Sequence, residues 1–223
     1  MRAAGTLGLI AVSLALAAPA GAIKARINAS DEARAKSSVL RISDLPGSSL
    51  WKGGQTAPKA PPDSCKGFSP KDSDLVVTGE AESTFTMPGA MVQSDVSLLA
   101  NPRMANLNWT RTFGPGFVRC ITTLLEDGFT RDSASARVLS AGTVPVQRLS
   151  TRTTEYRLLY EATVHGTGIP GVTDLVALQG GRTIVTLLVT SVLPSTSADE
   201  SGVDGVVDDL AQVLAQRAFA QTA

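Results

Sequence analysis

The feature that most constrains this fold is an alternation of side-chain types over residues 75–86. One set of alternate positions carries Leu75, Val77, Gly79, Ala81, Ser83 and Phe85, and the other carries Val76, Thr78, Glu80, Glu82, Thr84 and Thr86. Because successive side chains of a β-strand point to opposite faces, this period of two predicts a strand with one face on the core and one wet face. Met87-Pro88-Gly89 ends the run and the valine-containing residues 91–99 follow, so we predict an antiparallel hairpin.

Further strands and helices follow from the same kind of pattern. Segments rich in β-branched residues, separated in the later part of the chain by glycines, predict an antiparallel meander over residues 136–149, 154–165, 172–178 and 182–192. Caps and apolar spacings of three and four predict helices over residues 31–43, from Asn101-Pro102 onward, over 117–128 and over 203–219. Strands segregated from helices define the α+β class, so we predict a single α+β domain with an antiparallel sheet of about six strands flanked by helices.

The N-terminus is typical of a secretory signal peptide. Arg2 precedes an apolar run over residues 7–18, and Pro19-Ala20-Gly21-Ala22 ends in a small-residue cleavage pattern. We therefore expect cleavage after Ala22 and one extracytoplasmic domain over residues 23–223. The apolar run is shorter than the roughly 20 residues that span a bilayer, so we expect a secreted chain with no stable membrane insertion after cleavage. An anchor that is never cut remains the alternative.

Charge excludes one class of partner. Lysine plus arginine and aspartate plus glutamate number 20 each, and loss of Arg2 with the signal leaves a net charge of about −1. Proteins that bind nucleic acid carry clustered excess basic charge. We therefore expect no nucleic-acid partner.

The two cysteines, Cys65 and Cys120, predict a disulfide. An exported chain meets an oxidising compartment, and closing a loop across 55 positions is worth about 4 kcal/mol in the chain-entropy model. A redox-active pair is the alternative, although such pairs usually lie in a C-x-x-C motif. Cys65 lies in a proline- and glycine-rich stretch, residues 53–70, which we predict to be a surface loop that the disulfide staples onto the helix at 117–128.

Catalytic motifs are missing from the sequence. His165 is the only histidine and no serine lies in a G-x-S-x-G turn, so neither a catalytic triad nor a zinc site is indicated. Without a phosphate-binding glycine motif either, we expect no enzyme, no metal and no cofactor. Paired carboxylates are the exception: Glu80 with Glu82, or Glu155 with Glu161, could serve a hydrolase, whereas charge on the wet face of a strand is the simpler reading.

Several short motifs together carry a resemblance. They are Leu-Arg-Ile-Ser-Asp-Leu-Pro over residues 40–46, then Trp51, the two cysteines, and Leu-Gln-Gly-Gly-Arg over residues 178–182. This set resembles actinobacterial exported proteins, including lipoproteins and extracellular sensor-like domains of receptor kinases with a Mog1/PsbP-type fold. The resemblance covers most of residues 31–220, and it implies an antiparallel sheet flanked by helices with a ligand groove on the sheet.

Trp51 and Trp109 are the candidate ligand-groove residues, because aromatic side chains near loops can line a groove; packing in the core is the alternative. Export, near-neutral charge, missing catalytic motifs and the resemblance favour a non-catalytic binding domain for a small molecule or a component of the cell envelope. Two alternatives stay open: an accessory protein that docks on another envelope protein, and a carboxylate-based hydrolase.

Overall fold

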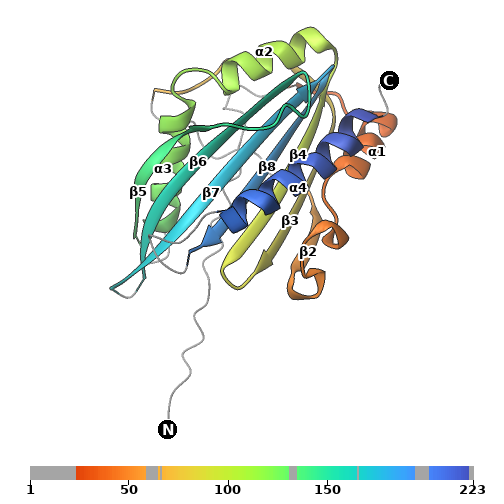
Figure 1. The fold of residues 1–223 in the computed structure, drawn as a ribbon. Helices are drawn as coiled ribbons and strands as arrows, with labels where there is room; N and C mark the ends of the chain where they lie inside the picture. The colour runs from red at the N-terminus through yellow and green to blue at the C-terminus, as the bar shows by residue number, and fades with distance from the viewer. Residues whose placement is uncertain are drawn as a thin grey trace.

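A computed structural model describes residues 24–58, 65, 67–130, 135–164, 166–193 and 201–220 (Figure 1). The expected signal peptide and His165 lie outside them. The strands are β1 (Lys24–Ala25), β2 (Lys52–Thr56), β3 (Val76–Met87), β4 (Ala90–Leu99), β5 (Ser135–Val144), β6 (Arg152–Val164), β7 (Thr167–Gly180) and β8 (Thr183–Val192). The α-helices are α1 (Ala29–Ser38), α2 (Pro102–Thr112), α3 (Phe117–Thr130) and α4 (Ser201–Phe219), and short 3₁₀ turns lie at Ile42–Asp44 and Ser48–Leu50.

The strands form one sheet in the order β1-β3-β4-β8-β7-β6-β5, with β2 also paired to β3. The sheet has eight strands, so the expectation of about six was too low. The two extra strands are short and share the outer edge of β3, β1 in parallel and β2 antiparallel. The sequence Lys-Gly-Gly-Gln-Thr of β2 has no apolar alternation and lies in the stretch we predicted to be a loop, so only its tertiary partner makes it a strand.

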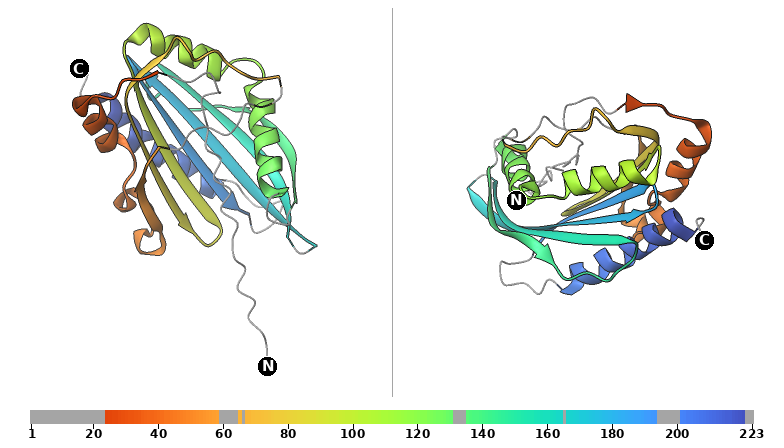
Figure 2. Two further views of the ribbon diagram at one scale, coloured as in Figure 1. Left: turned by 180° about the vertical axis from the view of Figure 1, so that it is seen from behind. Right: turned by 90° about the horizontal axis from the view of Figure 1, so that it is seen from above.

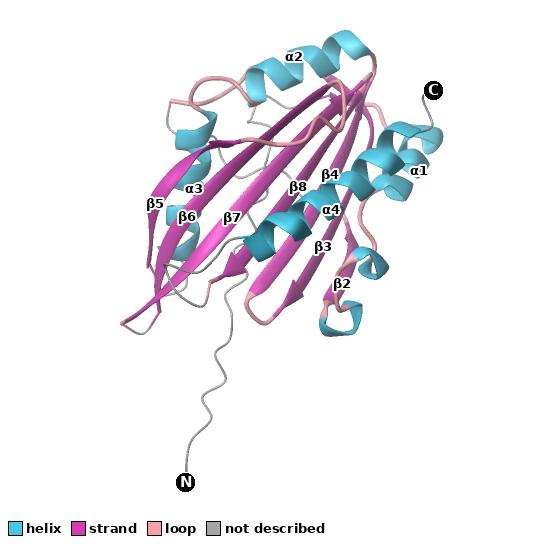
Figure 3. Ribbon diagram, in the orientation of Figure 1, coloured by secondary structure: helices cyan, strands magenta, loops and turns pink. Residues whose placement is uncertain are grey.

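Helices cover both faces of the sheet, which confirms the α+β class (Figures 2 and 3). α1 and α4 pack on one face, here called the α1–α4 face, with a core that includes Phe85, Leu187 and Leu214. α2 and α3 stand on the opposite α2–α3 face, where the core includes Ile121 and Leu175. The sheet is therefore the middle layer of three.

A β-bulge near the start of β3 changes which face its side chains meet. The register with β4 shifts between Val77 and Gly79. Before the bulge, Val77 packs with Ala105 of α2; after it, Phe85 packs on the α1–α4 face. The single alternation expected over residues 75–86 is therefore wrong for its first residues, because one inserted residue moves every later side chain to the other face.

α1 begins and ends earlier than the sequence indicates. Its cap is Asn28, whose side chain accepts a hydrogen bond from the amide of Asp31. The Asp31 carboxylate is then free to pair with Arg182 in the β7–β8 turn at 2.7 Å, which holds the pKa of Asp31 well below its usual range. The helix stops at Ser38 because Val39 and Leu40 leave it in an extended conformation and are buried.

The mid-chain helices and the disulfide are confirmed. The Asn101 side chain accepts from the amide of Met104, and Pro102 occupies the first turn of α2, as the Asn-Pro signal predicts. Cys65 and Cys120 are joined, with their Cα atoms 5.3 Å apart. The segment before β3 is thereby attached to α3.

At the opposite side of the sheet, β5 is the edge strand. A second bulge lies between Val138 and Ser140, and it leaves Leu139 46% exposed. The backbone N–H of Val138 donates to the Glu126 carboxylate of α3 at 2.9 Å. The Glu126 side chain therefore interrupts the row of backbone hydrogen-bonding groups of this edge strand.

Candidate functional site

A cavity of about 410 Å³ lies beside the outer edge of β3. β1 pairs with β3 only at residues 76–77 and β2 only at residues 82–86, so part of that edge is left between them. The lining residues are Ile27, Glu32, Lys36, Gln55, Thr56, Ala57, Pro58, Glu80, Ala81 and Glu82. The volume lies within the range of small-molecule sites.

The rim of the cavity is fixed by polar contacts between α1 and β2. Lys36 pairs with Glu32 one turn earlier at 2.6 Å, and the side-chain amide of Gln55 donates to the backbone carbonyl of Lys36 at 2.7 Å. One lysine stands among three glutamates in the lining, so the cavity carries a net negative charge.

Glu80 and Glu82, the carboxylate pair that the hydrolase alternative would use, both line this cavity. The side chain of Glu82 accepts hydrogen bonds from the hydroxyls of Thr56 at 2.9 Å and Thr84 at 3.2 Å. Glu80 is half-buried, and burial raises the pKa of its carboxyl. The structure thus brings both glutamates to one site, with only Glu82 held by threonines.

A third carboxyl, Asp95, belongs to the same region. It lies directly opposite Glu82 in the β3–β4 pair. Burial, followed by the nearby charge of Glu82, raises the pKa of Asp95 to about 7, while Gln93 and Thr186 donate weak hydrogen bonds to it. We call Glu80, Glu82, Gln93, Asp95 and Thr186 the polar strip. A hairpin with Pro88-Gly89 as its turn pairs Met87 with Ala90, and counting back from that pair places Asp95 opposite Glu82, so the sequence did contain the signal.

The face that carries the polar strip is not wet. Glu82 is 3% exposed, although its alternation with Ala81 and Ser83 predicted an outward position. Neighbouring strands account for part of the difference, because Thr56 of β2 donates to the Glu82 carboxylate and Asp95 of β4 lies opposite it; α2 and α3 stand on the same side of the sheet (Figure 2). Alternation shows that a strand has two unlike faces; it does not show what lies above the polar one.

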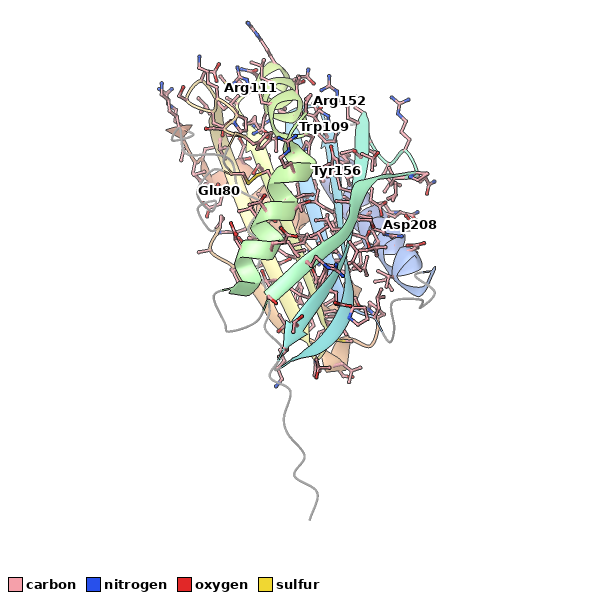
Figure 4. The ribbon with its side chains drawn as sticks, turned by 90° about the vertical axis from the view of Figure 1, so that its left-hand side faces the viewer. Glu80, Trp109, Arg111, Arg152, Tyr156 and Asp208 are labelled. Carbon is pink, nitrogen blue, oxygen red and sulfur yellow. A yellow bond between two sulfur atoms is a disulfide. The ribbon has the colours of Figure 1, made fainter. Side chains whose placement is uncertain are left out.

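The two tryptophans lie on opposite faces of the sheet. Trp51 is buried on the α1–α4 face, and its indole N–H donates to the carbonyl of Pro46 at 2.9 Å. Trp109 of α2 is half-buried on the other face, 4.7 Å from the ring of Phe113, which also stacks with Tyr156 (Figure 4). Neither is among the residues that line the cavity. The structure does not bring them together, and their role in ligand binding stays a prediction.

Glu155 and Glu161, the other carboxylates considered, are far from the polar strip in the sheet order, since both lie on β6. Glu155 is buried near Arg157, which pairs with Asp174 at 2.6 Å and with Asp204 at the start of α4. This charge cluster belongs to the contact between α4 and the sheet.

Within the described ranges, no three His, Cys, Asp or Glu side chains gather as a metal-binding group. Among the helices of that same part of the chain, none is long and apolar enough to cross a membrane.

Comparison with known proteins gives likenesses to solved structures only. No protein-family model matches the chain, and no curated protein matches it. Among solved structures, the extracellular domain of PknH from Mycobacterium tuberculosis is similar over 82% of this chain and 95% of that chain, at 12% sequence identity and a TM-score of 0.43. A likeness at this level transfers no function, and the Mog1/PsbP-type assignment stays a prediction.

Proposed function

We propose that this chain is an exported, non-catalytic binding domain that holds a small molecule or a component of the cell envelope. The observation that carries the proposal is the cavity beside β3, which places the carboxylates of Glu80 and Glu82 beside the amide of Gln55. A few polar groups converging on a cavity of this size are typical of ligand sites.

Export is supported by two features of different kinds. The first 22 residues have the pattern of a cleavable signal, and Cys65 and Cys120 form the single disulfide. Disulfides persist in oxidising compartments and are rare in the cytosol. The proposed place of action is therefore outside the cytoplasm.

The non-catalytic half of the proposal is supported by the missing catalytic motifs, since the sequence has one histidine and no serine in a G-x-S-x-G turn. In the cavity, the hydroxyls of Thr56 and Thr84 donate to the Glu82 carboxylate and hold it in place. Paired carboxyls are also what the carboxylate-based hydrolase would use, so turnover of a captured ligand would favour that alternative.

Native mass spectrometry of the protein recovered from the medium or periplasm, run without reductant, tests the proposal. A mature mass that begins at Ile23, is lower by two hydrogens and carries a small-molecule adduct is the expected result. Ala57→Trp, which places an indole in the cavity from an exposed position, should lose the adduct. Ala100→Trp, exposed just past the end of β4 and not among the residues that line the cavity, is the matched control and should keep it.

Other outcomes have definite meanings. An adduct that Ala57→Trp keeps would show that the ligand binds elsewhere. A clean apo monomer would contradict the proposal and favour the accessory protein that docks on an envelope partner. A chain that keeps its first 22 residues would show an uncut anchor.

A further inference from the structure

Residues 67–75, here called the strap, connect the disulfide to the start of β3. At its first end, Cys65 is bonded to Cys120 of α3. The ring of Phe68 packs edge-on against Phe117 of the same helix, with the ring centres 6.2 Å apart. The strap is therefore fastened to α3 by a covalent bond and an aromatic contact.

The second end of the strap is fastened to α2 by one arginine. Arg111 donates to the backbone carbonyl of Lys71 at 2.6 Å and makes a two-pronged contact with Asp74 at 2.6 and 3.0 Å. Leu75 is fully buried in a small core with Ala105 of α2. Two-pronged arginine–carboxylate pairs hold geometry well, so this end is also defined.

Asp72 lies between these attachments and is the exception in the strap. Its residue is 1% exposed, yet neither of its carboxylate oxygens has a hydrogen-bond partner in the described part of the chain. Its own backbone carbonyl accepts from the amide of Leu75 at 2.8 Å, which fixes the main chain at this point. A buried carboxylate without hydrogen bonds is far more costly than a buried neutral carboxyl.

The charged groups around Asp72 do not relieve this cost. Arg111 is the nearest cation acting on it, but its guanidinium is committed to Asp74 and to the carbonyl of Lys71. Asp74 opposes the ionisation of Asp72 through its own negative charge. Burial is the largest influence, and it raises the pKa of Asp72 to about 6.

We propose that Asp72 makes the strap a pH-sensitive latch, which stays closed while the carboxyl is protonated and opens more often once the carboxylate is ionised and can reach water. The strap runs beside α2 and α3, on the same side of the sheet as these helices, and it faces the sheet surface that carries the polar strip (Figure 2). Opening of the latch would therefore increase access to that face from mildly acidic to alkaline pH. This inference does not depend on the proposed function.

The size of the effect follows from linkage between protonation and opening. A carboxyl with a pKa near 6 in the closed strap and the ordinary 3.8 in the open one changes the opening equilibrium by about 100-fold in total. About tenfold of that change falls between pH 5 and pH 8. Because the folded-state pKa is raised, the closed state is favoured at low pH and loses its advantage as pH rises through 6.

Hydrogen–deuterium exchange of the full disulfide-bonded chain, corrected for the intrinsic pH dependence of amide exchange, measures this opening. Protection of peptides covering residues 67–75 should fall about tenfold from pH 5 to pH 8. Asp72→Asn, which has the shape of the neutral carboxyl, should give a flat profile. Phe68→Leu, the matched control, should lower protection at every pH and keep the slope, because it loosens the contact with Phe117 without changing the charges around Asp72.

Three results would overturn the latch: a flat wild-type profile, an unchanged slope in Asp72→Asn, or a slope lost in Phe68→Leu. Titration of the carboxyl carbon of Asp72 by NMR in the wild-type chain gives a second measurement that needs no variant. An apparent pKa near the ordinary aspartate value there would equally refute the proposal.

Discussion

Glu155 is a single side chain whose protonation the fold changes substantially. It is 5% exposed beneath the contact between α4 and the sheet. Burial, then the charge of Asp174, raises the pKa of Glu155 to about 7, and Arg157 offsets only part of the increase. Figure 4 shows Asp208, another acidic residue that acts on Glu155, on α4. Ionised Glu155 therefore opposes the docking of this helix.

Glu155→Gln should stabilise the chain at alkaline pH. A carboxyl with a raised folded-state pKa contributes its full stability below the unfolded value of 4.5 and loses it as pH rises through about 7. The advantage of the variant over the wild type in free energy of unfolding should be about 2–3 kcal/mol larger at pH 8.5 than at pH 5. Urea unfolding at both pH values measures the difference. Glu161→Gln on the same strand is the control, and an equal pH dependence in both variants would contradict the prediction.

At this scale, part of the candidate site was predictable from the chain alone. Glu80 and Glu82 stand out by alternation, and the hairpin turn fixes Asp95 opposite Glu82. The burial of Glu155 was not predictable, because it depends on where α4, which packs on β7 and β8, comes to lie relative to β6. Asp72 gives no local signal either, since a lone aspartate in a polar loop is ordinarily solvated.

Among the elements, the close packing of α1 against the sheet depends on one glycine of β3, Gly79. A Cβ atom at Gly79 would lie 2.4 Å from the backbone of Asp31 and 2.7 Å from the amide of Glu32. The backbone of α1 therefore approaches the strand as closely as it does only because no side chain intervenes.

Gly79→Ala should separate α1 from the sheet and cost about 1–3 kcal/mol of unfolding free energy, the usual range for overpacking against a structure that cannot relax. Thermal or urea unfolding followed by circular dichroism measures the loss. Gly142→Ala in β5, where an added Cβ meets nothing within 4 Å, is the matched control and should be near neutral. Equal stabilities of the two variants would mean that α1 yields without cost.

Sequence patterns predicted the long elements and missed the short ones. The long elements, β3 to β8 and the four α-helices, carry periodic apolar residues or caps. Their own sequences therefore predict whether each segment is a helix or a strand. β1 and β2 do not, because a strand of two residues and a strand with Gly53-Gly54 exist only through their pairing with β3. The bulge at Val77 was equally hidden, since a bulge is a property of two strands in register.

For the whole molecule, the α+β class and the layer of helices on the sheet could be predicted, whereas the face that each helix covers could not. Among the contacts predicted from the sequence, the disulfide joins the two residues that are furthest apart in the chain. It closes a loop with a sequence separation of 55 that contains the strap, β3, β4 and α2.

Removal of the disulfide should therefore lower global stability. Cys65→Ser with Cys120→Ser, or reduction of the wild type, should cost about 2–4 kcal/mol, because the unfolded chain regains the freedom of the open loop. Urea unfolding with and without reductant measures the cost, and the double variant should show no response to reductant. Coincident unfolding curves for the oxidised and reduced wild type would contradict this account.

The edge at β5 has a consequence for behaviour in crowded solution. Sheets grow into fibres where a long, regular edge offers an incoming strand an uninterrupted row of backbone groups. Here the bulge at Leu139 breaks that row, and the Glu126 carboxylate already occupies the amide of Val138. A strand of a second molecule that approaches this edge meets a negative charge and backbone groups that are out of register, so it cannot pair along the whole of β5. The interruption should therefore make the β5 edge a poor site for pairing with a second copy of the chain.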